Sequence, residues 1–223
     1  MPARFRRLAL GLPVLLALAL FTGGAPARVS AASSFTFDSY FRSSYEHQVD
    51  SRTCCASSTA MMMNILNGRD LGLNQYSILK YSQPRDALDD AVQRGTDPLG
   101  WSRAATYFSR YTSRPTTYMW EAYSSEATAL KRAAHQIAKY GKAVGLLVQH
   151  GRHAVVMTGF TSTRNPLKGS FKVTAIFYSD PLGTRHSYVS AADSPLNSYR
   201  ELDATPAYDA AWYGKYVIIV PRN

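Results

Sequence analysis

The chain has 223 residues, 46% of them hydrophobic, a formal net charge of +10 and only two cysteines. This length suits one domain with a hydrophobic core, and two cysteines exclude a disulfide-rich scaffold. Beyond the N-terminal segment there is no run of like charge, fixed repeat or basic recognition motif, so we expect no nucleic-acid partner.

The first 31 residues have the pattern of a secretory signal peptide. Arginines come first, followed by the apolar stretch Leu8–Phe21, which is short for a membrane span. Val29–Ala31 is a small-residue cleavage site, and Ala25–Ala27 is a second candidate. We therefore predict a signal peptide at 1–31 and a secreted mature domain at 32–223, extracellular or associated with the cell wall. The alternative is an uncleaved N-terminal anchor.

The predicted mature chain is basic. Residues 1–31 contain four arginines and no acidic residue, so their removal leaves a formal charge of +6. Such a charge allows contact with an anionic cell-wall polymer, although it also serves plain solubility. No later segment is apolar enough to cross a bilayer, and we predict no membrane span in the mature chain, which we expect to be a monomer.

The first half of the mature chain reads mainly as helices. After an extended lead-in over Ala31–Ser44, a helix is expected to begin at Cys54 or one residue later. Its apolar residues recur at steps of three and four, and Asn67–Gly68 is a C-terminal capping signal. Three further elements are predicted: a helix over Asn74–Tyr81, a turn over Thr96–Gly100 and a helix over Trp101–Tyr111.

The pattern changes after the next helix. That helix runs from Ser124 to Gly141, with serine at its start, glutamate in its first turn and glycine at its end. Beyond it the residues are typical of strands. Strands are predicted over Ala143–Gln149, His153–Phe160, Phe171–Ser179 and Tyr216–Val220. A helical N-terminal half followed by a mostly antiparallel sheet predicts an α+β fold.

Aromatic residues are concentrated between the helices and the sheet. Core packing is the first interpretation of this span, and the wall of a substrate groove is the alternative. The residues are Tyr107, Phe108, Tyr111, Tyr118, Trp120 and Tyr123.

The two cysteines, Cys54 and Cys55, are neighbours. Neighbouring Cα atoms lie about 3.8 Å apart, closer than an ordinary disulfide allows. At a helix N-terminus, however, the helix dipole and free N–H groups favour a thiolate. Cys54 is therefore a candidate nucleophile, with a buried structural thiol as the alternative. Cys55 is interpreted as a core residue.

A cysteine nucleophile needs a base, a group that orients the base, and donors for the oxyanion. His153 opens an apolar strand and is preferred as the base to His150, which lies in the preceding turn. Asp180 ends the next strand, and antiparallel pairing would place it beside His153. Gln48, six residues before Cys54, could form the oxyanion hole with the Cys54 backbone N–H.

The remaining histidines, His47, His135 and His186, have no supporting pattern and are interpreted as surface residues. The histidines and cysteines do not fall into metal-ligand spacing. We expect no metal and no cofactor.

The order of these residues resembles the papain-like cysteine peptidase superfamily. The six-residue step from Gln48 to Cys54 is similar to the spacing between glutamine and nucleophile in that superfamily. The run from Cys54 to Met62, Cys-Cys-Ala-Ser-Ser-Thr-Ala-Met-Met, resembles the Cys-Gly-Pro-Thr-Ser-x-Ala-Met run of bacterial, bacteriocin-processing-like leader peptidases. Cys55 departs from the family's usual glycine or tryptophan, which leaves the choice between the two cysteines slightly open.

Two later stretches carry the same resemblance. Gly151–Gly159 is similar to the Gly-Gly-His-x-Val-Val-x-x-Gly strand of those peptidases, and Ser179–Pro181 is similar to their Asp-Pro. The resemblance covers about residues 45–183 and is carried by the motifs in order, since each alone is weak.

The resemblance implies a secreted thiol protease with a papain-like α+β fold. In such a fold a helical half carries the nucleophile helix, an antiparallel sheet forms the other half, and a cleft lies between them. It implies that Cys54 attacks, His153 is base and acid, Asp180 orients the imidazole and Gln48 stabilises the oxyanion, with a peptide or protein as substrate. Two alternatives are an amidase or acyltransferase acting on cell-wall peptides, and an inactive binding module of the same fold.

Overall fold

The computed structural model of the protein describes residues 34–87, 95–201 and 206–223. The predicted signal peptide lies outside the described residues, all of which belong to one unit, Ala32–Asn223. Within these residues no helix is long and apolar enough to cross a membrane.

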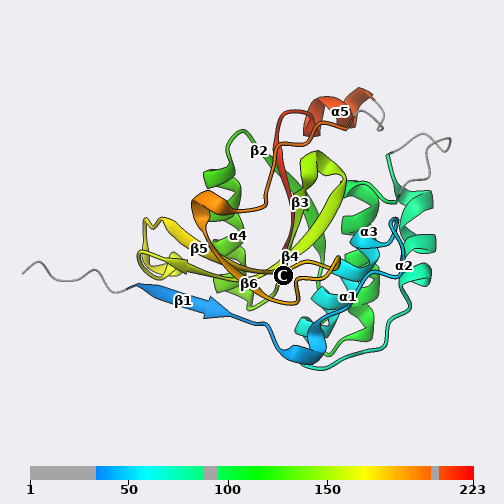
Figure 1. Cartoon of the computed structure of the whole chain (residues 1–223), viewed down its shortest axis with the longest axis horizontal. Helices are drawn as coiled ribbons and strands as arrows, with labels where there is room; N and C mark the ends of the chain where they lie inside the picture. Colours follow the sequence, from blue (N-terminus) through cyan, green and yellow to red (C-terminus); the bar gives the residue numbers. More distant parts are fainter. Residues whose placement is uncertain (1–33, 88–94, 202–205) are drawn as a thin grey trace, which may run out of the picture. The chain divides into compact units, whose positions relative to one another are not determined.

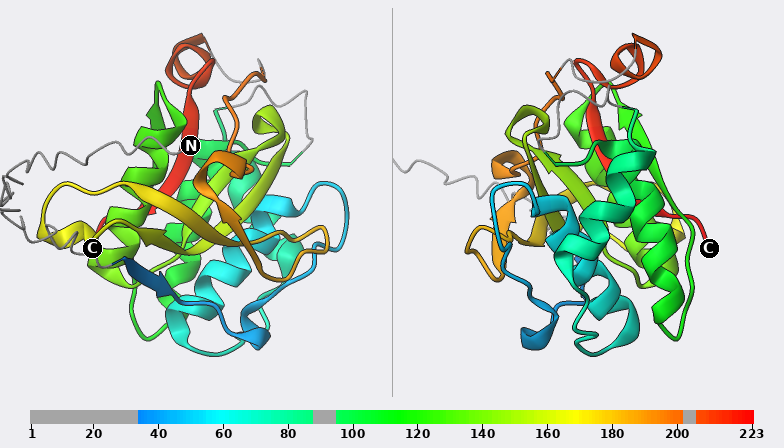
Figure 2. Two further views of the ribbon diagram at one scale, coloured as in Figure 1. Left: turned by 60° about the vertical axis from the view of Figure 1, so that its left-hand side comes forward. Right: turned by 90° about the vertical axis from the view of Figure 1, so that its right-hand side faces the viewer.

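The centre of the unit is a sheet of seven strands, and every pairing in it is antiparallel. The strand order is β2-β7-β3-β4-β5-β6, and β1 pairs with the last residues of β4 (Figure 1). The last strand of the chain, β7, therefore runs between β2 and β3 in the interior of the sheet (Figure 2). The strands are β1 (Phe35–Asp38), β2 (Tyr118–Tyr123), β3 (Val144–Val148), β4 (His153–Ser162), β5 (Val173–Ser179), β6 (Ser187–Ser190) and β7 (Tyr216–Pro221).

Helices cover both faces of this sheet. On one side, α1 packs against β4 while α3 packs against β2 and β7; on the other, α4 packs mainly against β7 and β4 (Figure 1). The α-helices are α1 (Cys54–Asn67), α2 (Gln75–Ser82), α3 (Pro98–Phe108), α4 (Glu126–Tyr140) and α5 (Pro206–Trp212).

Alternating side chains of the central strands divide the core into two parts. Ala154 and Val156 of β4 face α1, whereas Val155 and Met157 face the α4 side. This is the two-residue period of a strand buried on both faces, which explains why β3 and the stretch Ala154–Met157 of β4 are continuously apolar.

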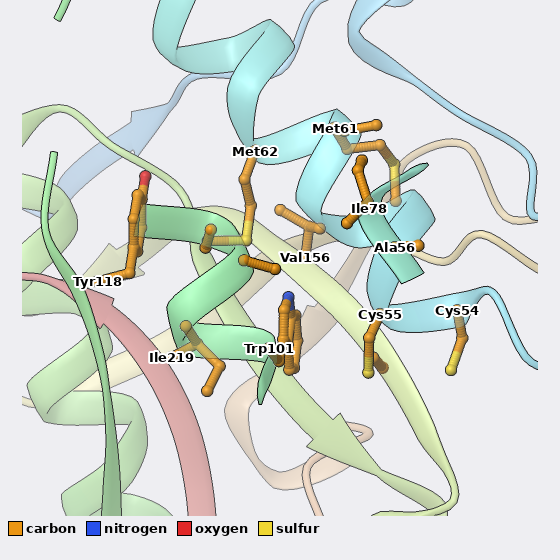
Figure 3. Close-up of a cluster of buried hydrophobic side chains, with 14 of the residues drawn as sticks. Cys54, Cys55, Ala56, Met61, Met62, Ile78, Trp101, Tyr118, Val156 and Ile219 are labelled. Atoms are coloured by element: carbon orange, nitrogen blue, oxygen red, sulfur yellow. The ribbon is translucent and has the colours of Figure 1, made fainter. Parts of the chain in front are cut away.

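The helix α1 lies inside this core. All of its residues from Cys54 to Leu66 are buried, including Met61, Met62 and Met63. Figure 3 shows Met61 near Ile78 of α2, whereas Met62 points toward Val156 of β4 and Trp101 of α3. Flexible methionines suit such an enclosed helix because they fill irregular gaps.

The predicted α+β class is confirmed, and the main elements fall close to their predicted limits. The helix beginning at Cys54 is confirmed, and Gly68 ends it with a φ of 75°. The helices at 75–82 and 126–140 and the four predicted strands are also present. The division into a helical half and a sheet half is only approximate, since β2 precedes α4.

Several elements differ from the prediction. The turn predicted over Thr96–Gly100 is wrong in part, because Asp97 caps α3 by accepting a hydrogen bond from the Gly100 N–H and the helix starts at Pro98. Strands β1, β2 and β6 and helix α5 were not predicted. Two of these strands lie in stretches interpreted as an extended lead-in and as an aromatic-rich span.

Candidate active site

The candidate nucleophile lies where α1 meets β4. Cys54 is the first residue of α1 and is 8% exposed. The first turn of the helix has no side-chain cap, since the Thr53 hydroxyl instead bonds Asp50. Ser58, one turn further on, donates to the backbone carbonyl of Ala154 at 3.2 Å. This bond fixes the start of α1 against the start of β4.

His153 is the first residue of β4, as predicted, and a tight turn over Gln149–Gly151 precedes it in the chain. Its backbone pairs with Val148 across the β3–β4 hairpin. Gly151, in the turn, has a φ of 103°, and a Cβ there would lie 2.6 Å from the ring of Tyr199. The imidazole is buried, with its side chain 4% exposed. These constraints leave His153 little freedom to move away from Cys54.

Asp180 follows β5 and contacts His153. Because Val156 of β4 pairs with Ser179 of β5, the end of β5 lies beside the start of β4. Asp180 Oδ1 lies 2.7 Å from His153 Nε2 and also accepts the Leu182 N–H at 2.8 Å. Nε2 is therefore occupied by the carboxylate, and Nδ1 is the ring nitrogen left for Cys54.

The pKa values of these three groups move in the directions that favour an ion pair. Hydrogen bonds from the Cys55 thiol and from His153 lower the pKa of Cys54 to about 5, although burial opposes the shift. Burial acts to lower the pKa of His153, but its bonds to Asp180 and Cys54 outweigh that effect and raise the pKa to about 9. Burial acts to raise the pKa of Asp180, yet the bond to His153 lowers it. Between these values the thiolate and the imidazolium coexist.

Gln48 lies in the same region, but its side chain is bonded to Asp50 and not to Cys54. It is 6% exposed, its Nε2 donates to the Asp50 carbonyl at 2.8 Å, and its Oε1 has no partner. An amide nitrogen carries two hydrogens, so Nε2 keeps one for a ligand. The backbone N–H of Gln48 donates to Pro181 O at 3.0 Å. This bond holds the loop around Gln48 against the turn that follows Asp180.

Residues with no sequence signal hold that loop in place. The buried Gln75 side chain donates to His47 O at 2.7 Å and accepts from Val49 N–H at 3.1 Å, so it grips the backbone on both sides of Gln48. The Tyr45 hydroxyl donates to Asp180 O at 3.2 Å. Such contacts between side chain and distant backbone leave no periodic pattern, and Gln75 was predicted only as part of a helix.

The other histidines lie where the sequence placed them or close to it. His150, the rival base, is exposed, and its Nδ1 lies 2.9 Å from Ser198 O. His47 and His186 are exposed, and His186 pairs with Asp38 at 2.8 Å. His135 is partly buried, which differs from the predicted surface position.

The aromatic span contributes to the core and to a cavity elsewhere. Tyr118 is 3% exposed and Phe108 is 7% exposed, as core packing predicts. Tyr107 and Tyr118 also line a cavity of about 280 Å³ with three arginines, and none of the four candidate site residues lines it.

The chain matches no protein-family model, and no curated protein is significantly similar to it.

Proposed function

We propose that the protein is a cysteine peptidase of the papain-like kind, hydrolysing peptide bonds with Cys54, His153 and Asp180. The observation that supports this most is the continuous chain of contacts from the Cys54 thiol through His153 to Asp180, with Nε2 and Oδ1 2.7 Å apart. A core histidine needs no thiol on one side and a carboxylate on the other. The motifs of the sequence and the placement of the cysteine at a helix N-terminus agree with this function.

The reaction follows from the charges of the site. The Cys54 thiolate attacks the substrate carbonyl carbon, and negative charge develops on the carbonyl oxygen. The free hydrogen of Gln48 Nε2 and the backbone N–H of Cys54 are the donors proposed for that oxyanion. The His153 imidazolium gives its proton to the leaving amine, and the C–N bond breaks to leave a thioester on Cys54.

Hydrolysis of the thioester restores the enzyme. His153, now neutral, takes a proton from water as the water attacks the thioester carbonyl. The C–S bond then breaks, and the acid product leaves with Cys54 again a thiolate and His153 again protonated. Asp180 keeps the imidazole in the orientation in which Nδ1 faces the sulfur. No cofactor takes part in these steps.

We also propose that the protein is exported, since the first 31 residues have the composition of a signal peptide. A basic, secreted peptidase would meet protein or peptide substrates outside the cell, near anionic wall polymers.

The proposed activity is tested by labelling the purified protein with an epoxide inhibitor directed at thiol peptidases, followed by peptide mass mapping. We expect fast labelling at Cys54 that His153→Ala slows on the order of 10²-fold, because the base is lost. His150→Ala is the matched control, since that histidine is exposed and bonded elsewhere, and it should label at the wild-type rate. Slow labelling of both cysteines, unaffected by His153→Ala, would contradict the peptidase and favour a binding module.

A further inference from the structure

The two cysteines are in contact, and both are free thiols. Cys55 is 4% exposed, against 8% for Cys54, so neither faces bulk water. In Figure 3 both side chains leave the first turn of α1 and both sulfur atoms point to the same side. Cys55 is thus a core residue, as predicted, and its sulfur lies on the same side of the helix as that of the candidate nucleophile.

Cys55 has two acceptors within reach of one proton. Its Sγ lies 3.7 Å from the backbone carbonyl of Thr96, and its side chain also hydrogen-bonds Cys54. A thiol carries a single S–H. When Cys54 is a thiol, the Cys55 S–H can donate to Thr96 O. When Cys54 is a thiolate, the S–H can rotate and donate to the Cys54 sulfur, which is then the stronger acceptor.

The charged groups around the pair keep the proton on Cys55. On the Cys54 side, His153 faces the sulfur and Asp180 lies behind the imidazole. On the other side, the carboxyl groups of Asp86 and Asp97 disfavour a thiolate on Cys55 when they are ionised. The bond to Cys54, burial and these carboxyl groups all raise the pKa of Cys55. The two thiols therefore differ in role, one ionised and the other a neutral donor.

We propose that Cys55 is a positioning residue whose S–H donates to the Cys54 thiolate and thereby extends the activity of the site toward acid pH. This inference rests on the proposed peptidase function and deepens it. It gives a reason for a cysteine at position 55, where the peptidases that the sequence resembles usually have glycine or tryptophan. Neither of those residues carries a thiol that could donate to the Cys54 sulfur.

The test uses Cys55→Ala and Cys55→Ser, each of which leaves Cys54 as the only thiol of the chain. The pH dependence of alkylation by iodoacetamide and the thiolate absorbance near 240 nm then report on Cys54 alone. Loss of a hydrogen bond to a charged group should move the acid limb of Cys55→Ala up by about one to two pH units. A serine hydroxyl can still donate, so Cys55→Ser should stay close to the wild-type profile.

The serine variant separates donation from packing. Alanine and serine are both smaller than cysteine, so a purely structural role would make the two variants shift together. Circular dichroism melting of both variants checks that each is folded. An unchanged acid limb in Cys55→Ala, or equal shifts in both variants, would overturn the inference.

The same measurement distinguishes this inference from the proposed function. If Cys54 of the wild type reacts as an ordinary thiol, with an apparent pKa of about 8.5, the peptidase site itself is wrong and Cys55 has no thiolate to hold. If Cys54 has a low pKa that depends on His153 but not on Cys55, the peptidase proposal stands and only the role of Cys55 fails. Cys54→Ala is the control for Cys55, which should remain unreactive up to alkaline pH.

Discussion

Two polar clusters of this protein, both partly buried, respond to burial in opposite ways. In the first, Cys54, His153 and Asp180 lie in a row, and each ionised form finds a partner of opposite charge. In the second, Asp86 and Asp97 are two carboxyl groups placed together, and the Thr96 hydroxyl and the Asp97 N–H both donate to Asp86. Cys55 lies between the two clusters and interacts with both.

The difference shows in the pKa values. In the first cluster the pKa of the Cys54 thiol is lowered to about 5 and the pKa of the His153 imidazole is raised to about 9, so both groups are charged at neutral pH. In the second, burial and the charge of Asp97 raise the pKa of Asp86 to about 8, so this acid keeps its proton. Burial acts on all of these groups. In the first cluster hydrogen bonds and opposite charges outweigh it, whereas in the second the like charge of Asp97 adds to it.

The largest effect on the proposed peptidase reaction is expected from Gln48→Ala, since Gln48 is the proposed oxyanion donor. Loss of one oxyanion donor typically lowers the rate on the order of 10²- to 10³-fold. The variant should bind a peptide aldehyde inhibitor correspondingly less well, because the tetrahedral adduct places an oxygen where the oxyanion forms. Alkylation of Cys54 by iodoacetamide needs no such donor and should be unchanged. Equal affinity of variant and wild type for the aldehyde would remove Gln48 from the site.

Asp180→Asn tests whether the carboxylate sustains the ion pair. Hydrolysis of a peptide substrate by the wild type should have a bell-shaped pH dependence, rising near pH 5 as Cys54 ionises and falling near pH 9 as the imidazolium that protonates the leaving amine is lost. Without the Asp180 charge the pKa of His153 should fall, so the alkaline limb moves to lower pH and the rate at pH 8 drops about tenfold or more. NMR titration of the His153 ring gives the shift directly. An alkaline limb that stays in place would show that the carboxylate is structural.

A smaller effect is expected from Gln75→Ala. This change frees the backbone on both sides of Gln48, at His47 O and Val49 N. The Gln48 amide should then sample more positions, and aldehyde affinity should drop about three- to tenfold, less than in Gln48→Ala. Gln75→Glu is the matched variant, since it keeps the acceptor for Val49 and loses the donor to His47. A loss as large as that of Gln48→Ala would indicate that the whole loop has rearranged.

The positions of the three central residues could be predicted from the sequence, because local rules place them. A helix that starts at Cys54 fixes the thiol at its N-terminus, and the short turn before His153 fixes the start of β4. The next strand in sequence pairs with β4, so Asp180 follows at the correct end. Each of these steps depends on neighbours in the chain.

The contacts that were missed depend on residues far apart in the sequence. Strand β2 is held by β7, about a hundred residues later, and its own burial pattern shows no clear alternation. Asp97 was assigned to a turn although its capping bond from the Gly100 N–H is local; only its contact with Asp86 depends on a segment from earlier in the chain. The bond that Gln48 makes to Asp50 O is local and was missed for another reason, since an amide can bond any nearby carbonyl and leaves no sequence signal.

The smallest effect on the reaction, and a clear one on stability, is expected from Asp86→Asn. The unfolded chain releases the Asp86 proton near pH 3.8, whereas the native state holds it to about pH 8. Its contribution to the free energy of unfolding is thus complete below pH 3.8 and is lost as the pH rises through about 8, with a slope of at most about 1.4 kcal/mol per pH unit. Asparagine imitates the neutral acid and still accepts from Thr96 and Asp97.

Urea unfolding of Asp86→Asn and wild type at a series of pH values between about 5 and 8 measures this difference. The wild type should lose stability toward pH 8 more steeply than the variant, because only the wild type takes up a proton at position 86 on folding. Asp193→Asn is the control, since that carboxyl is exposed and bonds a neighbouring serine. Parallel stability curves for Asp86→Asn and wild type would mean that burial and the charge of Asp97 do not raise the pKa of Asp86 in the native state. The contrast between a cluster of opposite charges and one of like charges would then not hold.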